Sequence, residues 1–431
     1  MKVAYGNRFL DVKLPSGCSF DLIEPPRTAP LFIPLHEQIE KAFQNPIDFP
    51  PLEEYLKEKS KILLVVPDGT RPCPLPEILP IIVESIQRLS HASIRIVVAN
   101  GTHTPMTTGS LRQHVGAQIF DHLQIIQHNA YSKDMVEVGK TRRGIQVAIN
   151  PILLDCEAIL VVGPVQHHYF AGFGGGPKLI IPGLAALETT IQNHRLAISE
   201  NGRLHPECRE GIIDGNPVAE DICEAISLCP PVLHLGLILD ERGQVIDVLA
   251  GDLQKTHRRL ARKYHRAHLH IVNEQRPLVI ASAGGEPRDC NLIQAHKGLH
   301  RASRLVKSEG MLVYFAECKE GIGSETFLPW FDFSSASKMA SELTRNYTLN
   351  GHTALVMKEK TERIKIILVS DLPIETVSKM GMTPIMPVQS NLLNLGELIT
   401  PMQEGNSWIL PHAGEILPLP YDELRPEDSC I

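Results

Sequence analysis

The sequence predicts an α/β protein with two domains, each built on a mainly parallel sheet. Short, strongly apolar runs recur along the 431 residues, and the segments between them repeat their apolar residues at helical spacing. Strands that alternate with helices in this way are typical of parallel sheets, in which a helix connects one strand to the next. The chain is also long enough for two or three domains with separate cores.

The first domain is predicted from three apolar runs and the helices that follow them. The runs at 61–66 (KILLVV), 93–99 and 158–162 are the strands. The apolar spacing predicts helices over 75–89 and 184–191, and later a helix at 218–228 and a hairpin over 235–248.

A second series of strands begins near residue 276, after a basic helix that we interpret as a solvated connector between domains. The last residues contain a short strand at 408–411 and a Pro/Asp/Glu-rich end, and we expect this tail to pack back on the first domain. The predicted parts are an N-terminal α/β domain at 1–250, a helical connector at 251–275, a C-terminal α/β domain at 276–398 and a tail at 399–431.

Composition excludes several classes of function. The formal charge of −7 argues against a protein that binds nucleic acid or an anionic membrane, and aromatic residues at 5% are too few for a base-stacking surface. The start MKVAYGNRFL lacks a signal-peptide pattern, and no apolar run is long enough to span a bilayer. Nine scattered cysteines without a C-x-x-C pair fit a reducing compartment. We therefore expect a cytoplasmic protein.

The segment from Gly163 to His194, GPVQHHYFAGFGGGPKLIIPGLAALETTIQNH, is the strongest candidate for a site. It reads as a strand, a glycine loop and a helix. Glycines allow the backbone to approach a ligand closely, and backbone N–H groups that lead into a helix suit a phosphate. Glycine loops also occur simply because turns need positive φ, but Lys178 at the end of this one places an amine within reach of a ligand.

Two further strand ends carry titratable side chains. The strand at 61–66 runs into PDGTRP, with Asp68, Thr70 and Arg71, and the strand at 93–99 runs into NGTHTP, with His103. An Asp-Gly turn alone needs no functional explanation. Ligands of open α/β sheets bind at the carboxyl ends of the strands, so these residues and His168 are predicted to share one crevice.

The motifs DGTRP and NGTHTP, the Gly163–His194 segment and QAHKG together resemble the nickel-dependent lactate racemase family, in the same order and over nearly the whole chain. The resemblance implies two α/β domains around an inter-domain cleft, joined by helices. It also implies a nickel-pincer nucleotide, which is a pyridinium mononucleotide that carries two sulfur donors and one nickel. Enzymes that build this cofactor would be partners.

The resemblance assigns roles by motif match. Lys178 would tether the cofactor covalently, His194 would coordinate nickel, and His103 and His168 would be the acid/base pair; His167 is interpreted as a neighbour without a role. The remaining implied residues are Asp68, Thr70, Arg71, Gly174, Gly175 and Gly176 around the cofactor, and Arg71, Ile293, Gln294, Lys297 and His352 around the substrate.

The implied reaction explains why histidines are needed at these positions. A 2-hydroxy acid transfers a hydride from C2 to an electron-poor pyridinium more easily than it loses a proton from C2, provided that a base takes the hydroxyl proton at the same time; the product is a flat 2-keto acid, to which the hydride can return on either face. Histidine titrates near working pH, and two histidines serve the two enantiomers. The predicted activity is therefore a racemase or epimerase of 2-hydroxy acids.

The substrate is less well defined by the sequence. The lactate enzymes have a tyrosine at the position of Ile293 and, by approximate alignment, a tryptophan at the position of His352. Both differences alter the pocket wall, so a more polar or longer 2-hydroxy acid than lactate is one possibility. The sequence does not identify the oligomeric state.

The sequence lacks the motifs of two other enzyme classes. An NAD-dependent dehydrogenase needs an early G-x-G-x-x-G, and a zinc hydrolase of the H-E-x-x-H type needs that motif; the sequence has neither. Two alternatives stay open, namely a pincer-nucleotide enzyme of another hydride-transfer type and a non-catalytic nickel- or nucleotide-binding protein.

Overall fold

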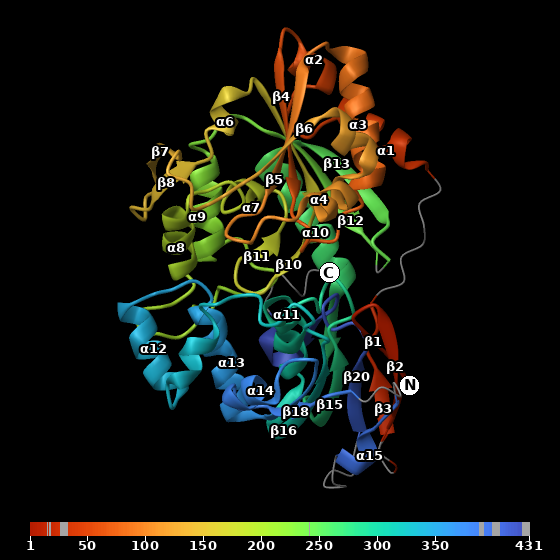
Figure 1. Ribbon diagram of the computed structural model, residues 1–431, viewed down its shortest axis with the longest axis vertical. Coiled ribbons are helices and arrows are strands. Elements are labelled where there is room, and N and C mark those ends of the chain that lie inside the picture. The colour runs from red at the N-terminus through yellow and green to blue at the C-terminus, as the bar shows by residue number, and fades with distance from the viewer. Residues whose placement is uncertain are drawn as a thin grey trace. The chain divides into compact units, whose positions relative to one another are not determined.

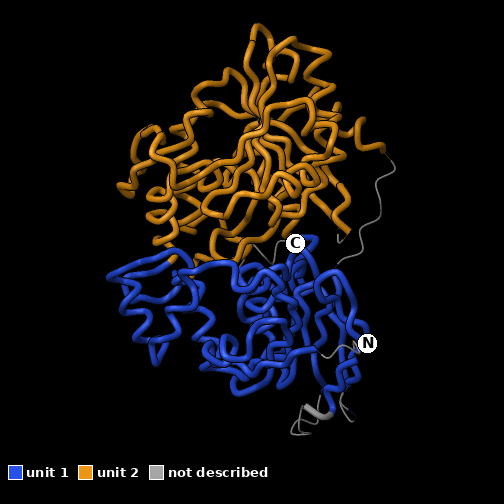
Figure 2. Tube along the Cα trace, in the orientation of Figure 1, with its two compact units in different colours: residues 1–26, 198–205, 266–431 blue, residues 27–197, 206–265 orange. Residues whose placement is uncertain are grey.

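The computed structural model describes residues 1–14, 16, 19–25, 33–240, 242–387, 392–398 and 406–424. The chain divides into two compact units, which Figure 2 colours separately. Unit 1 comprises Met1–Pro26, Ile198–His205 and Arg266–Ile431, and unit 2 comprises Arg27–Ala197 and Pro206–His265. No helix among the described residues combines the length and apolar character needed to cross a bilayer.

Unit 2 is built on a mainly parallel sheet. Its strand order is β13-β12-β9-β4-β5-β6, and only the β12–β13 pair is antiparallel. The central strands are buried on both faces, as their nearly unbroken apolar sequences require. The bounds are β4 (Lys61–Pro67), β5 (Ser93–Ala99), β6 (Gln124–Gln127), β9 (Ala158–Pro164), β12 (Leu233–Leu239) and β13 (Val245–Asp252).

Helices cover this sheet and carry apolar residues on their inner faces. In α3 the buried Leu75, Ile78, Leu79 and Ile82 follow one another at helical spacing and pack against strands of the sheet. The helices are α1 (Leu35–Gln44), α2 (Leu52–Leu56), α3 (Leu75–Leu89), α4 (Thr108–Val115), α5 (Ala117–His122), α6 (Ile152–Asp155), α7 (Pro177–Ile180), α8 (Leu187–Arg195), α9 (Pro217–Ile226) and α10 (Leu253–His268). Two small hairpins complete the unit: β7 (Val136–Lys140) with β8 (Gln146–Ile149), and β10 (Gln166–His168) with β11 (Gly172–Gly174).

Unit 1 contains a second sheet whose neighbouring strands are all parallel, in the order β18-β17-β16-β15-β20-β3. The predicted fold class, two α/β domains with mainly parallel sheets, is confirmed. The strands are β3 (Ser19–Leu22), β15 (Arg276–Ser282), β16 (Val306–Phe315), β17 (Lys365–Val369), β18 (Thr383–Ile385) and β20 (Asn406–Leu410). Smaller sheets join β1 (Lys2–Tyr5), β2 (Arg8–Lys13) and β19 (Leu392–Asn394), and β14 (Leu269–Val272) with β21 (Leu417–Pro420).

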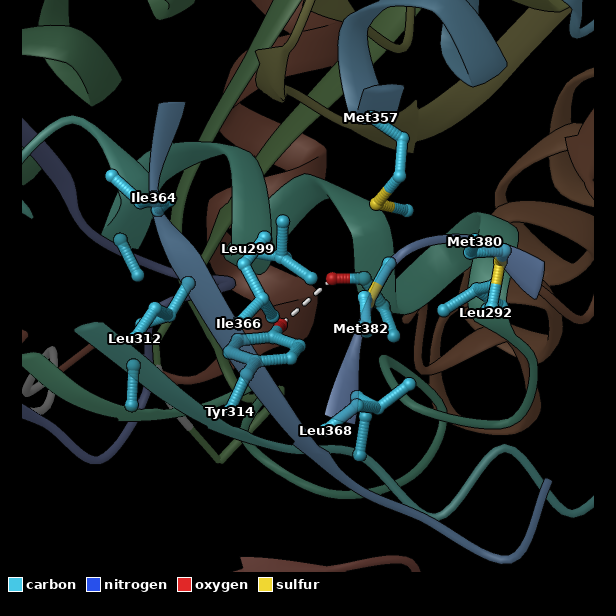
Figure 3. Packing of buried hydrophobic residues seen from close by; sticks show 14 of the residues in the cluster. Leu292, Leu299, Leu312, Tyr314, Met357, Ile364, Ile366, Leu368, Met380 and Met382 are labelled. Carbon is cyan, nitrogen blue, oxygen red and sulfur yellow. Dashed lines mark hydrogen bonds between the residues drawn. The ribbon is translucent and has the colours of Figure 1, made fainter. Parts of the chain in front are cut away.

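The core of unit 1 lies between this sheet and its helices (Figure 3). Leu299, Leu312, Met357 and Ile366 pack together there, and the hydroxyl of the buried Tyr314 donates a hydrogen bond to the carbonyl of Ala295 at 2.7 Å. The helices are α11 (Leu292–Ser303), α12 (Ala336–Arg345), α13 (Gly351–Arg363), α14 (Ile374–Lys379) and α15 (Leu395–Leu398), with 3-10 turns at Leu328–Asp332 and Tyr421–Glu423.

The two ends of the chain do not follow the predicted domain boundaries. Strand β20 pairs with β15, and β3 pairs with β20, so both belong to the sheet of unit 1. The described part of the tail therefore packs on the C-terminal domain, contrary to our expectation, and residues 1–26 do not belong to the N-terminal domain. A short strand pairs its backbone with whatever sheet edge is open, and its own sequence does not specify that edge. Residues 399–405 and 425–431 of the predicted tail lie outside the described residues.

The connector predicted at 251–275 contains the expected helix, but this helix is packed on one face and is not fully solvated. Helix α10 occupies most of it, and Leu260, Ala261 and Tyr264 of this helix are buried in a cluster with Val165 and Phe173. One face of α10 therefore packs against the segment that carries the candidate site.

Candidate active site

Three neighbouring strands of unit 2 deliver the predicted site residues. Strands β9, β4 and β5 lie side by side and run parallel, so their carboxyl ends share one edge of the sheet. Figure 1 labels β4 and β5 of this group. Asp68 follows β4, His103 follows β5, and His168 belongs to the hairpin that follows β9.

Asp68 and His103 form a hydrogen-bonded pair. Nδ1 of His103 lies 2.7 Å from Oδ2 of Asp68, and the Thr70 hydroxyl donates to the same carboxylate at 2.9 Å. Burial by itself raises the pKa of Asp68, but the charge and hydrogen bond of His103, the charge of Arg71 and the Thr70 hydroxyl outweigh it and lower the pKa to about 2. The ionised carboxylate accepts from Nδ1–H of His103, so Nε2 is the ring atom that is left to bind or release a proton.

The loop that carries His103 is tied to the loop that follows Lys178. The backbone N–H of Gly101 donates to the carbonyl of Gly183 at 3.0 Å, and the N–H of Gly183 donates to the carbonyl of Lys178 at 3.0 Å. His103 and the Lys178 segment are therefore held by one continuous chain of backbone hydrogen bonds.

His168 ends strand β10, directly opposite Gly172 of β11. It is buried, and its Nδ1 accepts a long hydrogen bond of 3.3 Å from the backbone N–H of Ala171. The ring stacks on Tyr169 at 5.6 Å and meets the edge of Phe170 at 4.6 Å between ring centroids. These contacts fix the plane of the imidazole.

Lys178 lies in the first turn of α7, after the glycine turn at Gly175 and Gly176. Both glycines have positive φ, and the backbone N–H of Lys178 donates to the carbonyl of Gly175 at 3.0 Å. Its Nζ is buried and has no hydrogen-bond partner among the described residues. Burial and, to a smaller extent, the charge of Arg71 lower the pKa of Lys178 to about 7. Half of these amines are therefore neutral near pH 7.

Phe170 brings three of the predicted residues together. Its ring centroid lies 5.4 Å from Nζ of Lys178, 5.0 Å from the ring of His194 and 4.6 Å from the ring of His168. Phe170 was not among the site residues predicted from the sequence. The only signal was its place in the motif HHYFAGFGGG.

The glycine turn differs from the predicted phosphate site in one respect. Gly174 belongs to strand β11, and only Gly175 and Gly176 form the turn into α7. Helix α7 spans Pro177–Ile180, which is too short to supply the aligned N–H groups and dipole that a longer helix directs at an anion. The local structure of this turn favours a role in presenting Lys178.

The other predicted residues belong to unit 1. Ile293, Gln294 and Lys297 lie on α11, where Asn291 caps the helix by accepting from the N–H of Gln294 at 3.1 Å. Nζ of Lys297 donates to Oε1 of Gln294 at 2.6 Å, so these two side chains form one polar group.

His352 lies on α13 and is buried. Its Nδ1 is 2.7 Å from the hydroxyl of Tyr347, and the two rings stack with an interplanar angle of 7°. Charges on Lys360 and His352 add to burial in lowering the pKa of His296, which lies on α11. Both α11 and α13 therefore contribute to one polar, largely basic region of unit 1.

The predicted nickel site has only one protein ligand, His194. In the part of the chain that the structure describes, no group of three or more His, Cys, Asp and Glu side chains has the geometry to hold a metal ion. His194 is the residue that the sequence singled out as a nickel ligand, and it lies in the last turn of α8.

Comparison with known proteins identifies relatives along most of the chain. Residues 5–205 match the family model of the lactate racemase N-terminal domain, and residues 271–401 match that of the lactate racemase C-terminal domain. The lactate racemase of Lactiplantibacillus plantarum is 30% identical over 293 residues, which are 68% of each chain. That of Thermoanaerobacterium thermosaccharolyticum is 27% identical over 358 residues, 80% of this chain and 82% of the other.

Two solved structures share the fold. The lactate racemase apoprotein from Thermoanaerobacterium thermosaccharolyticum superimposes with a TM-score of 0.85 at 24% identity, over 97% of this chain and 99% of that one. A protein from Thermotoga maritima gives a TM-score of 0.70 at 16% identity, over 89% and 98% of the two chains. The sequence matches extend this likeness from fold to family: the chain belongs to the lactate racemase family, a family of isomerases.

Proposed function

We propose that this protein racemises or epimerises a 2-hydroxy acid at C2 by reversible hydride transfer to a nickel-pincer nucleotide attached to Lys178. The observation that carries the proposal is the buried Nζ of Lys178, which has no hydrogen-bond partner among the described residues and lies, with His168 and His194, around Phe170. A protein does not bury an amine in this way without cost, so the amine is expected to have a bonding partner in the working enzyme.

The residues present fit such a cofactor. A lysine whose pKa lies near 7 offers a neutral, nucleophilic amine for covalent attachment. His194, next to the same aromatic ring, offers an imidazole nitrogen, which suits nickel. Asp68, Thr70 and Arg71, together with Gly174, Gly175 and Gly176, would line the cofactor; when bound, it supplies an electron-poor ring that accepts a hydride from C2 and returns it.

His103 and His168 would exchange the hydroxyl proton of the substrate. Asp68 holds Nδ1–H of His103, so Nε2 is the atom that takes the proton. For His168 the Nδ1 contact with Ala171 is 3.3 Å long, weak enough to be given up when the ring binds a second proton. Each histidine would act as base toward one enantiomer and as acid toward the other.

Arg71 or Lys297 would hold the substrate carboxylate. Arg71 offers a planar fork for two hydrogen bonds, and Lys297 offers a point charge that Gln294 orients at 2.6 Å. Ile293 and His352 would line the side that faces the rest of the substrate. Where the lactate enzymes have a tryptophan by approximate alignment, His352 would favour a polar or longer substituent at C3 over the methyl group of lactate.

The test is an intact mass and a nickel analysis after exposure to the cofactor maturation system, with Lys178→Ala in parallel. We expect a covalent adduct and one nickel in the parent, and no covalent adduct in the Lys178→Ala variant. A panel of chiral 2-hydroxy acids would then identify the substrate. If the parent remains without an adduct under conditions that load a known lactate racemase, the proposal is wrong.

A non-catalytic nickel- or nucleotide-binding protein remains the alternative. It would need Lys178 and His194 but would have no use for the pairing of Asp68 with His103. That pairing favours the enzyme, and variants of the two acid/base histidines separate the two cases, as described in the Discussion.

A further inference from the structure

Helix α10 contacts the glycine turn through His257. This histidine is buried, and its Nε2 lies 3.1 Å from the carbonyl oxygen of Gly174. A carbonyl oxygen only accepts, so Nε2 must carry the proton and donate it. Burial, and to a smaller extent the charge of Arg258, lower the pKa of His257 to about 4 against the opposing effect of the Gly174 carbonyl. The ring is therefore neutral at physiological pH, and the donor is always present.

The same ring lies directly against the turn. A Cβ placed on Gly176 would be 2.7 Å from Cδ2 of His257, closer than real side chains approach. Gly176 also has a φ of +46°, which favours glycine. The space that a side chain at position 176 would need is therefore filled by the His257 ring.

Lys178 is held by the turn that His257 supports. The backbone N–H of Lys178 donates to the carbonyl of Gly175, and that of Leu179 donates to the carbonyl of Gly176, each at 3.0 Å. The direction in which the Lys178 side chain leaves the backbone thus depends on the residues that His257 contacts.

A second contact shows that α10 supports the whole hairpin. Nε2 of His167 lies 3.0 Å from Nδ1 of His265, and the ring of His167 also meets Tyr264 edge-on at 5.0 Å. His265 and Tyr264 lie two turns along α10 from His257. His167, to which the sequence assigned no role, therefore attaches strand β10 to the same helix.

We propose that His257 is a positioning residue for Lys178: by donating to Gly174 and packing under Gly176, it fixes the turn that keeps the Lys178 amine buried and correctly directed. This inference rests on the proposed attachment role of Lys178 and adds to it a residue that lies outside the family motifs quoted above.

The experiment compares two replacements of equal length. His257→Gln keeps an N–H donor, whereas His257→Met fills similar space without one. His234→Met is the matched control, because His234 is fully buried, lies 6.4 Å from His257 between ring centroids, and has no hydrogen-bond partner among the described residues.

The readout is the reactivity of the Lys178 amine in cofactor-free protein, so it does not depend on the loaded enzyme. The amines are acetylated with a trace of acetic anhydride at several pH values, and the labelled peptides are quantified by mass spectrometry. The pH dependence gives the apparent pKa and the acetylation rate of Lys178, with the exposed Lys57 as the internal reference. Only a neutral amine reacts, and each unit by which its pKa rises lowers the neutral fraction about tenfold at pH below the pKa. Adduct yield with the maturation system is measured alongside.

We expect His257→Met to raise the apparent pKa of Lys178 by at least about one unit and to reduce adduct yield about tenfold or more. His257→Gln and His234→Met should resemble the parent. Equal pKa and yield in all variants would overturn the inference while leaving the attachment role of Lys178 intact. Absence of an adduct in the parent would instead contradict the proposed function.

A variant that fails to fold does not end the test. Gly176→Ala disturbs the same contact from the other side, because its methyl group would press on the His257 ring. It should shift Lys178 reactivity in the same direction as His257→Met. An unchanged Lys178 in folded Gly176→Ala would contradict the proposed positioning.

Discussion

In both units, titratable side chains lie at the carboxyl ends of the central parallel strands. The two units differ in the hydrogen-bond partners of those side chains. In unit 1 the turn after β1 fills this edge of the sheet. The hydroxyl of Tyr5 donates to Oδ1 of Asp371 at 2.6 Å, and the N–H of Gly6 donates to Oδ2 of Asp289 at 2.8 Å. The hydroxyl of Ser282, at the end of β15, donates to the carbonyl of Ala4 at 2.7 Å.

In unit 2 the corresponding loops present a different set. Asp68 orients His103, the hairpin carries His168, and the Lys178 amine is buried with no partner among the described residues. The topology that makes the carboxyl edge of an α/β sheet a common binding place is present in both units. The groups named in unit 1 are hydrogen-bonded by the chain itself, whereas the Lys178 amine of unit 2 has no hydrogen-bond partner among the described residues. Sheet topology therefore locates candidate sites, and the partners of the side chains decide which of them serves chemistry.

The largest effects are expected from the two acid/base histidines. His103→Asn and His168→Asn should each lower turnover by about 10²–10⁴-fold, the contribution typical of general acid–base catalysis, while nickel content and adduct mass stay at the level of the parent. His122→Asn, a change at an exposed histidine, should leave both unchanged. Full turnover in either active-site variant would exclude the acid/base assignment; full loading without turnover would exclude storage as the sole role.

Asp68→Asn should lower turnover by about tenfold to a hundredfold, because the ring of His103 loses the carboxylate that orients it. It should also lower stability at neutral pH. The pKa of Asp68 falls from its ordinary value of 3.8 to about 2 in the folded protein, so its stabilising contribution is present above about pH 4 and is lost as the pH falls toward 2. Thermal unfolding of parent and variant at pH 7, 4 and 3 checks this. A difference that does not shrink with acid would argue against an ionised Asp68, and Asp121→Asn at an exposed ion pair is the control.

Lys178→Met should stabilise the cofactor-free protein by on the order of 1–3 kcal/mol near neutral pH, because it removes a buried polar group without a partner. The lysine is neutral in the folded protein above about pH 7 and still charged in the unfolded chain up to about 10.5, so parent stability rises over that interval. The advantage of the variant should therefore be largest at pH 7 and below and should fade toward pH 10.5. Melting temperatures at pH 6.5 and 9.5 measure it. A variant that is less stable than the parent at both would mean that the amine has a stabilising partner.

The smallest effect is expected in unit 1. Tyr5→Phe should cost about 1–2 kcal/mol of stability by leaving the Asp371 carboxylate without its hydroxyl donor, and should leave turnover unchanged. Tyr421→Phe, at an exposed tyrosine of the same unit, should alter neither. A loss of turnover in Tyr5→Phe beyond its loss of folded protein would show that this edge also takes part in the reaction, and the contrast between the two units would fail.

The strands and the first-domain helices were predictable because their patterns are local. The run 61–66 is β4 with one more residue, and the hairpin expected over 235–248 is the antiparallel pair β12–β13. Each of these elements is recognisable from the apolar spacing of its own residues. The pairing of β20 and β3 with the sheet of unit 1 was not predictable, because it depends on which distant edge accepts them.

The site was only partly predictable for a similar reason. Motifs identified Lys178, His103 and His168, and their roles stay predictions. Phe170, which lies among Lys178, His168 and His194, belongs to the Gly163–His194 segment but was not one of the predicted site residues. His257, which lies under the glycine turn, belongs to none of the quoted motifs. An aromatic residue in a loop, or a histidine on a basic helix, can serve many structural roles. Its role becomes clear only from the residues that it contacts in the folded protein.

The sequence by itself determined the α/β class, the family motifs and the chemical types of the candidate residues, because these depend on short-range spacing and on side-chain identity. The tertiary structure decided which sheet the two chain ends join, that Asp68 holds the ring of His103, and that the amine of Lys178 is buried in a turn supported by α10. These features depend on contacts between residues far apart in the chain. Burial and hydrogen bonding, which set the pKa values and directions of the reactive groups, exist only after those contacts form.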